Sequence, residues 1–195
     1  MNVPTILTLI RLTVSPILLP VLIVTCLPAD NITLNGMVMF VFILFALTDF
    51  LDGYLARSRQ KASELGRILD PIADKFLVFS TLIALVAVHK LFFYWAIVLI
   101  GREFFVMGLR EISLEYGFSV RVALLGKIKM AVHMLFISFV ILNPAQALGA
   151  QAPIWNGIEL VLLIGSLFLS ILSAFYYYRD FSRRLREAKT VSQKN

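Results

Sequence analysis

The sequence predicts an all-α integral membrane protein with six transmembrane helices and both termini in the cytoplasm. Of its 195 residues, 59% are hydrophobic and only 15% are charged, and the mean hydropathy is +0.87. A soluble domain of this size rarely carries so little charge. No repeat, low-complexity linker or change in composition marks a domain boundary. We therefore expect residues 1–195 to form a single membrane domain.

Apolar segments of transmembrane length follow one another along the chain. A membrane-spanning helix needs roughly 20 mostly apolar residues. Six segments meet this length, in order Ile6–Leu27, Leu34–Ala56, Ile68–Val88, Phe92–Glu111, Val120–Leu142 and Ile154–Tyr178. The breaks between them hold polar or turn-forming residues, such as LPADN after the first segment, HK after the third and EYG after the fourth. At the third segment, Asp70 followed by Pro71 also has the pattern of a helix cap.

Basic residues set the orientation of the predicted helices. If the N-terminus is cytoplasmic, 17 of the 18 Lys and Arg residues fall on the cytoplasmic side, and only Lys90 falls outside. This bias follows the positive-inside rule and supports an even number of spans. The net charge of +6 therefore describes one membrane face and excludes a nucleic-acid-binding stripe. The basic tail RDFSRRLREAK is predicted to anchor the topology and contact the lipid surface.

Two single residues are predicted to be structural. Cys26 has no partner for an internal disulfide and is expected to pack as a small apolar residue. His133 lies in the fifth segment, where a lone histidine is expected to be a hydrogen-bonded core residue. Neither residue is predicted to carry chemistry.

Four aspartates in one short stretch, DFLDGYLARSRQKASELGRILDPIAD, stand at the ends of two apolar segments. Asp49 and Asp52 are three residues apart and Asp70 and Asp74 are four apart, so each pair shares one face of a helix. A carboxylate at such a position is costly unless something compensates its charge. Hard oxygen ligands in this number suit Mg²⁺ or Mn²⁺. We call these four residues the acidic frame and predict that it binds metal.

The acidic frame resembles a family signature. Its spacing, Asp-x2-Asp-Gly-x2-Ala-Arg-x8-Gly-x3-Asp-x3-Asp, is similar to that of the CDP-alcohol phosphatidyltransferases, with every fixed position filled. A second, weaker likeness lies near the N-terminus, where Pro4 to Arg11 resembles the family pattern Pro-Asn-x-Leu-Thr-x-x-Arg with Thr5 in place of Asn. The resemblance implies a membrane enzyme that moves a phosphatidyl group from CDP-diacylglycerol to an alcohol and releases CMP.

The resemblance also implies roles for individual residues. Two divalent cations, Mg²⁺ or Mn²⁺, are expected as cofactors, held by Asp49, Asp52 and Asp70 with Asp74 able to contribute. Asp74 is further expected to be the catalytic base that takes the proton of the acceptor hydroxyl. The residues expected to bind CDP-diacylglycerol are Thr8, Arg11, Gly53, Ala56, Arg57 and Gly66.

A basic group near the fourth and fifth segments bears on the acceptor alcohol. Arg102, Arg110, Lys127 and Lys129 are predicted to bind the phosphate of an acceptor, although Arg102 has a structural alternative as the partner of Glu103. The segments GREFFVMGLRE and GKIKM resemble the bacterial phosphatidylglycerophosphate synthase branch of the family, whose acceptor is glycerol 3-phosphate. Met130 departs from the Thr that is usual in this branch and leaves the two lysines intact.

Other functions remain as alternatives. The same signature serves acceptors such as an inositol phosphate, or phosphatidylglycerol in cardiolipin synthesis. A cation transporter also needs intramembrane carboxylates, but those are spread across the bilayer and often accompany a repeat. We expect a multi-pass protein of the bacterial cytoplasmic membrane with its site facing the cytosol and membrane lipids around it. The resemblance implies a homodimer.

Overall fold

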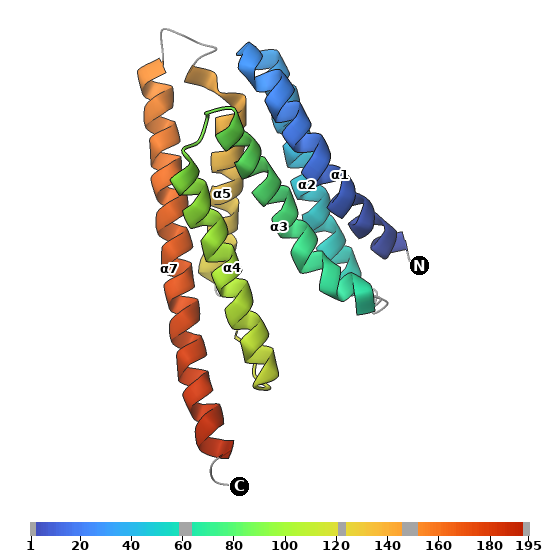
Figure 1. The fold of residues 1–195 in the computed structure, drawn as a ribbon, viewed down its shortest axis with the longest axis vertical. Helices are drawn as coiled ribbons and strands as arrows, with labels where there is room; N and C mark the ends of the chain where they lie inside the picture. Colours follow the sequence, from blue (N-terminus) through green and yellow to red (C-terminus); the bar gives the residue numbers. More distant parts are fainter. Residues whose placement is uncertain (1–2, 59–63, 121–123, 146–151, 193–195) are drawn as a thin grey trace. The chain divides into compact units, whose positions relative to one another are not determined.

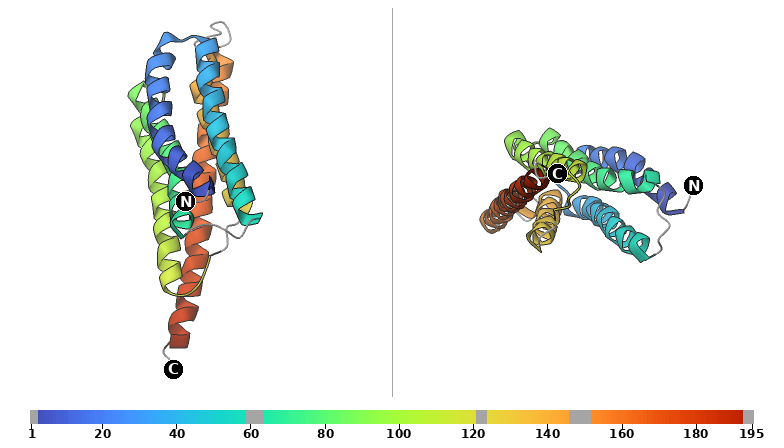
Figure 2. Two further views of the ribbon diagram at one scale, coloured as in Figure 1. Left: turned by 90° about the vertical axis from the view of Figure 1, so that its right-hand side faces the viewer. Right: turned by 90° about the horizontal axis from the view of Figure 1, so that it is seen from below.

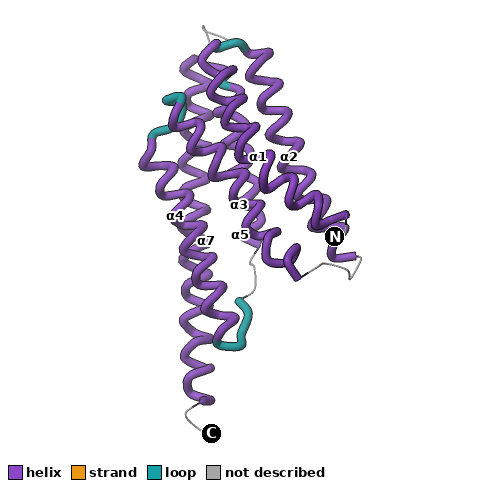
Figure 3. Tube along the Cα trace, turned by 45° about the vertical axis from the view of Figure 1, so that its right-hand side comes forward, coloured by secondary structure: helices purple, strands orange, loops and turns teal. Residues whose placement is uncertain are grey.

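The computed structural model describes residues 3–58, 64–120, 124–145 and 152–192, and it describes side chains for residues 13–47, 75–120, 124–145 and 153–187. Across these residues the regular secondary structure is helical (Figure 3), which confirms the predicted all-α class. The elements are α1 (Val3–Cys26), the 3-10 turn η1 (Leu27–Ala29), α2 (Ile32–Ser58), α3 (Glu64–Ala87), α4 (Phe93–Glu115), α5 (Leu124–Leu142) and α7 (Ala152–Ser192) (Figure 1).

Each of the six predicted apolar segments overlaps one of these helices, but several boundaries differ from the prediction by four residues or more, and two of the differences matter for the argument. Helix α3 begins at Glu64, so Asp70 and Pro71 lie inside the helix, and the alternative in which Asp70 caps it is wrong. Helix α7 does not end at Tyr178 but continues through the basic tail to Ser192. Asp180 supports this extension by pairing with Arg183 at 3.1 Å and Arg184 at 3.0 Å, one turn away.

Several helix ends are fixed by local interactions. The Asn31 side chain accepts a hydrogen bond of 2.9 Å from the Thr33 amide and caps the start of α2. Gly117 follows α4 with φ of 73°, a left-handed conformation that a glycine adopts without steric cost. Asn143, directly after α5, takes φ of 49°, which asparagine tolerates better than most residues. These turns end the helices where the apolar segments end.

The chain forms two compact units. The first comprises residues 1–96 and 137–157, and therefore contains α1, α2 and α3. The second comprises residues 97–136 and 158–195, which include most of α4, α5 and α7. The acidic frame belongs to the first unit, and the predicted acceptor residues belong to the second.

In the first unit α1 packs along α3 and beside α2 (Figure 2). The core between them is mostly apolar, with fully buried side chains from every helix: Leu19, Ile23, Phe42, Leu82 and Leu85. At the end of the unit away from the α2–α3 connection, the Asp30 carboxylate accepts hydrogen bonds from Lys90 Nζ at 3.1 Å and Asn143 Nδ2 at 3.0 Å. One carboxylate thus joins the α1–α2 connection, the α3–α4 connection and the residue after α5.

In the second unit, α4 and the C-terminal part of α7 share an apolar cluster. Leu109 of α4, Val120 and two residues of α7, Tyr177 and Phe181, are buried together. The rings of Phe118 and Phe181 lie with their centroids 5.8 Å apart. The extension of α7 therefore packs against the α4–α5 connection.

The exposed surfaces of the helices are suited to lipid. Among the described residues, two helical stretches, Leu124–Leu142 and Pro153–Glu187, are long and apolar enough to cross a membrane. Every long helix also exposes large apolar side chains by more than 60%: Ile17, Phe40, Ile83, Ile97, Leu124 and Val161. Exposing so much apolar surface to water would be unfavourable, whereas the acyl chains of a bilayer would cover it. The protein is accordingly a membrane protein.

Candidate active site

The acidic frame lies on two consecutive helices of the first unit. Asp49 and Asp52 are in the C-terminal half of α2, and Asp70 and Asp74 are in the first half of α3. Residues 59–63 connect the two helices. The side chains of residues 48–74 lie outside the described residues, so the structure locates these aspartates by their helix positions alone.

The two aspartate pairs lie at matching depths. Asp52 precedes the end of α2 at Ser58 by six residues, and Asp70 follows the start of α3 at Glu64 by six. At a rise of 1.5 Å per residue, both residues are about 9 Å from the connected ends, and Asp49 and Asp74 are about 14 to 15 Å away. Because α2 and α3 contact each other, the register supports the convergence expected from the sequence.

The residues expected on the nucleotide side fall close to the acidic frame along the helices. Gly53 directly follows Asp52, while Ala56 and Arg57 lie in the last turn of α2. Gly66 lies in the first turn of α3. The described backbone thus places all of them between the aspartate pairs and the connected ends.

Helix α1 brings a third segment to this end of the unit. Thr8 and Arg11 follow the start of α1 at Val3 by five and eight residues. These steps correspond to about 8 and 12 Å along the helix, depths similar to those of the aspartates on α2 and α3. Since α1 packs against both helices, it can contribute to the same site.

The donor chemistry of the acidic frame fits a divalent cation. Carboxylates are hard oxygen ligands of the kind that Mg²⁺ and Mn²⁺ prefer. Each of the two helices carries a pair of these carboxylates, so both helices can contribute ligands to one shared ion. Among the described side chains, which do not include residues 48–74, no group of three or more His, Cys, Asp or Glu residues is arranged to bind metal. Metal binding by the acidic frame stays a prediction from the sequence.

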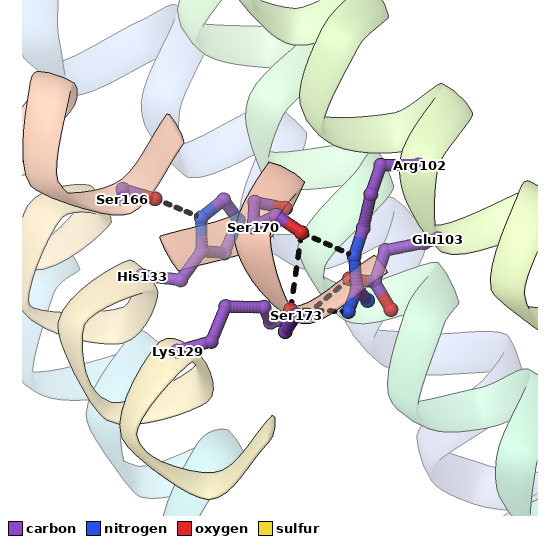
Figure 4. Close-up of polar contacts among 7 residues, drawn as sticks. All are labelled: Arg102, Glu103, Lys129, His133, Ser166, Ser170 and Ser173. Carbon is purple, nitrogen blue, oxygen red and sulfur yellow. Dashed lines mark hydrogen bonds and ion pairs between the residues drawn. The ribbon is translucent and has the colours of Figure 1, made fainter. Parts of the chain in front are cut away.

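A second group of charged residues is buried in the second unit, where α4, α5 and α7 meet (Figure 4). The Arg102 guanidinium donates from Nη1 to Glu103 Oε1 at 2.7 Å. Its other nitrogens donate to α7, from Nε to the Ser170 carbonyl at 2.9 Å and from Nη2 to the Ser173 hydroxyl at 2.6 Å. Lys129 of α5 forms an ion pair with the same oxygen of Glu103. We call Arg102, Glu103 and Lys129 the charged triad.

The structure brings together only some of the predicted acceptor residues. Arg102 and Lys129 meet at Glu103 and are largely buried, with side chains 11% and 5% exposed. Arg110 and Lys127 are exposed, at the C-terminal part of α4 and the first turn of α5. The Arg102–Glu103 pair, which was an alternative role for Arg102, is present.

Beside the triad, His133 of α5 lies with Nδ1 2.7 Å from the Ser166 hydroxyl of α7. His133 is buried, so its prediction as a hydrogen-bonded core residue is confirmed. The serines of α7 were not among the residues predicted from the sequence to be functional. Their spacing was a usable signal, because Ser166, Ser170 and Ser173 recur at intervals of four and three on one helical face.

Comparison with known proteins places the chain in a family. The model of the CDP-alcohol phosphatidyltransferase family matches residues 1–172. The CDP-diacylglycerol–glycerol-3-phosphate 3-phosphatidyltransferase of Wigglesworthia glossinidia brevipalpis is 34% identical over 197 residues, covering 94% of this chain and 98% of that protein. The protein of the same name from Rickettsia felis is 31% identical, covering 91% of this chain and 94% of its own length. An Arabidopsis thaliana protein, CDP-diacylglycerol–glycerol-3-phosphate 3-phosphatidyltransferase 2, is 35% identical, covering 94% of this chain and 81% of its own length.

The helical membrane fold, with two pairs of aspartates on consecutive helices, defines a class, that of helical membrane enzymes. Within that class, the chain belongs to the CDP-alcohol phosphatidyltransferase family. The resemblance found in the sequence is thereby confirmed.

Proposed function

We propose that this protein transfers the phosphatidyl group of CDP-diacylglycerol to glycerol 3-phosphate, giving phosphatidylglycerophosphate and CMP in phospholipid biosynthesis. The observation that carries the proposal is the likeness, over 91 to 94% of the chain, to proteins named for this reaction. The complete acidic frame adds the residues that such a transfer needs.

The reaction is a single displacement at the β-phosphorus of the donor. The acceptor hydroxyl oxygen forms a bond to this phosphorus, the bond to the CMP oxygen breaks, and CMP leaves with the bonding electrons. Asp74 takes the proton of the hydroxyl. None of the fixed positions of the motif from Asp49 to Asp74 is a Ser, Cys or His nucleophile, which favours direct transfer over a covalent intermediate.

The remaining residues bind and orient the substrates. Asp49, Asp52 and Asp70 would hold two divalent cations, which when bound neutralise the diphosphate and stabilise charge on its oxygens. Gly53 and Ala56 leave room for the nucleotide near the backbone, and the Arg57 guanidinium suits a phosphate oxygen. Thr8, Arg11 and Gly66 complete the donor side.

The proposal includes the finer topology. Six spans are supported by the lengths of α1, α2, α3 and α4, which are 24, 27, 24 and 23 residues. Each length corresponds to about 35 to 40 Å, enough to cross a hydrocarbon core of about 30 Å. The distribution of Lys and Arg along the sequence supports placing both termini in the cytoplasm. The basic bias assigns the acidic frame to the cytosolic face of a bacterial membrane. A single functional domain and a homodimer are part of the same proposal.

The decisive experiment tests the acceptor. Purified protein receives CDP-diacylglycerol, Mg²⁺ or Mn²⁺ and one of several alcohols, and mass spectrometry identifies the lipid product. We expect phosphatidylglycerophosphate and an equal amount of CMP with glycerol 3-phosphate. Glycerol is the matched control that lacks the phosphate and should give no product. A lipid formed only from an inositol phosphate or from phosphatidylglycerol would contradict the proposed acceptor and keep the family chemistry.

The exposed cations of the acceptor group give a further prediction. Arg110→Ala or Lys127→Ala should raise the apparent KM for glycerol 3-phosphate about tenfold, because a charge-assisted hydrogen bond contributes about 1.5 to 3 kcal/mol. Steady-state kinetics with each substrate varied in turn measures the effect. Arg183→Ala, an exposed arginine of the α7 extension, is the control and should leave both KM values unchanged. An increase confined to CDP-diacylglycerol would move these residues to the donor side.

A further inference from the structure

Two cations from different helices converge on one oxygen in the second unit. Glu103 Oε1 accepts from Arg102 Nη1 at 2.7 Å and is also paired with Lys129 Nζ. Arg102 is next to Glu103 on α4, whereas Lys129 comes from α5. The Glu103 oxygen therefore sets how close the guanidinium and the ammonium groups lie (Figure 4).

Helix α7 fixes the orientation of the guanidinium. The Ser170 carbonyl and the Ser173 hydroxyl accept from Arg102 Nε and Nη2. With the bond to Glu103, these contacts engage three of the five N–H groups that a guanidinium carries. Among the described residues, this leaves one N–H group on each terminal nitrogen, Nη1 and Nη2, for an oxygen of a bound anion.

Because the charged triad is buried, the negative charge of Glu103 is needed to offset the two positive charges of Arg102 and Lys129. The side chains of the charged triad are 5 to 14% exposed, so water screens the repulsion between Arg102 and Lys129 only weakly. With Glu103 in place the three groups carry a formal charge of +1, and without it they would carry +2. Removing one partner of a buried ionic group leaves an uncompensated charge, which drives the remaining groups apart.

We propose that Glu103 is a positioning residue of the acceptor site, holding Arg102 and Lys129 side by side at the spacing that one phosphate group requires. The inference rests on the proposed function, whose acceptor carries a phosphate group, and on the prediction from the sequence that Arg102 and Lys129 bind that phosphate. Glu103 does not touch the reacting atoms. It acts by holding its two partners in place before the acceptor arrives, so the acceptor does not have to overcome their repulsion.

Glu103 could instead compete with the acceptor phosphate for the two cations. In that case its removal would free Arg102 and Lys129 and strengthen acceptor binding. Its neutral isostere distinguishes the two cases, since Glu103→Gln keeps the size of the side chain and removes its charge.

The test compares the KM values of the two substrates in the full-length protein. We expect Glu103→Gln to raise the KM for glycerol 3-phosphate about tenfold, equivalent to about 1.4 kcal/mol, with kcat and the KM for CDP-diacylglycerol within about twofold of the parent protein. Glu103→Asp keeps the charge but shortens the side chain, so its KM for glycerol 3-phosphate should lie between those of the parent protein and Glu103→Gln. Glu115→Gln, an exposed glutamate of the same helix, is the matched control and should change neither KM.

A double substitution of Glu103 and Lys129 gives a result that a merely structural role of Glu103 would not produce. Lys129→Met alone should raise the acceptor KM, and adding Glu103→Gln should raise it little further, since Glu103 acts through Lys129. If Glu103→Gln elutes as an aggregate from size-exclusion chromatography, Glu103→Asp and Ser173→Ala carry the test, each with an expected increase of about threefold.

The outcomes separate this inference from the proposed function. An acceptor KM that falls or stays unchanged in Glu103→Gln overturns the positioning role, and so does an equal rise for both substrates. If the parent protein used another phosphorylated acceptor, the proposed function would fail, and the same KM comparison with that acceptor would still decide the role of Glu103.

Discussion

Asp74→Asn is expected to slow CMP release by at least about 100-fold while metal binding is largely retained. The amide has the size of the carboxylate but cannot accept a proton at neutral pH, and a general base contributes about 10²- to 10⁴-fold to a rate. We therefore expect kcat to fall by a factor in that range. CMP release from CDP-diacylglycerol and glycerol 3-phosphate measures kcat, and titration with Mn²⁺ followed by electron paramagnetic resonance measures metal binding.

Asp180→Asn is the matched control for this substitution. Asp180 lies on the α7 extension, where it pairs with Arg183 and Arg184, far along the chain from the acidic frame. The loss of this carboxylate should leave kcat within about twofold of that of the parent protein, since a partly exposed ion pair contributes little to stability. Full turnover by Asp74→Asn would remove the base role from Asp74 and leave it at most a metal ligand.

Asp49→Ala and Asp70→Ala should each lose activity and metal affinity together. One residue comes from α2 and the other from α3, so a shared metal site predicts the same defect from either helix. Removing a residue that only hydrogen-bonds to a metal ligand lowers metal affinity about 10- to 100-fold, and removing a direct ligand should lower it at least as much. The Mn²⁺ titration and the metal dependence of CMP release give the two measurements.

A difference between the two helices would contradict the shared site. If Asp70→Ala weakened metal binding and Asp49→Ala did not, the metal would belong to α3 alone. Restoration of full activity by excess Mg²⁺ would show that the substituted aspartate is only an auxiliary ligand. Chelation of the parent protein with EDTA should abolish turnover, and added Mg²⁺ or Mn²⁺ should restore it.

The helices were predictable because transmembrane length and hydropathy are properties of a continuous segment. Each predicted segment, such as Leu34–Ala56, falls on one helix of the structure. The errors lie at boundaries where hydropathy and helix propensity diverge. Helix α3 starts at Glu64, before its apolar part, and α7 continues after Tyr178 because RDFSRRLREAK is rich in helix-forming residues with favourable ion pairs.

The positions of the acidic frame on two consecutive helices were predictable because its residues are close in sequence and lie in apolar segments, while its metal-binding role stays a prediction. Of the charged triad, only the Arg102–Glu103 pair was foreseen, as an alternative role for Arg102. Lys129 is 26 residues beyond Glu103 and on another helix, and nothing in the spacing shows that their side chains meet. The contacts of Arg102 with Ser170 and Ser173 span 68 and 71 residues. Such contacts depend on which helices pack together, and apolar periodicity does not determine that when most helix faces are apolar.

The length of α7 has a practical consequence for the study of this protein in cells. The helix has 41 residues and so extends about 60 Å, and the part beyond Tyr178 alone extends about 20 Å. A fluorescent reporter fused to the end of this extension would be carried by a continuous helix, so its orientation would follow the rotation of α7. Polarised emission from such a fusion would then report tilting of this helix during turnover.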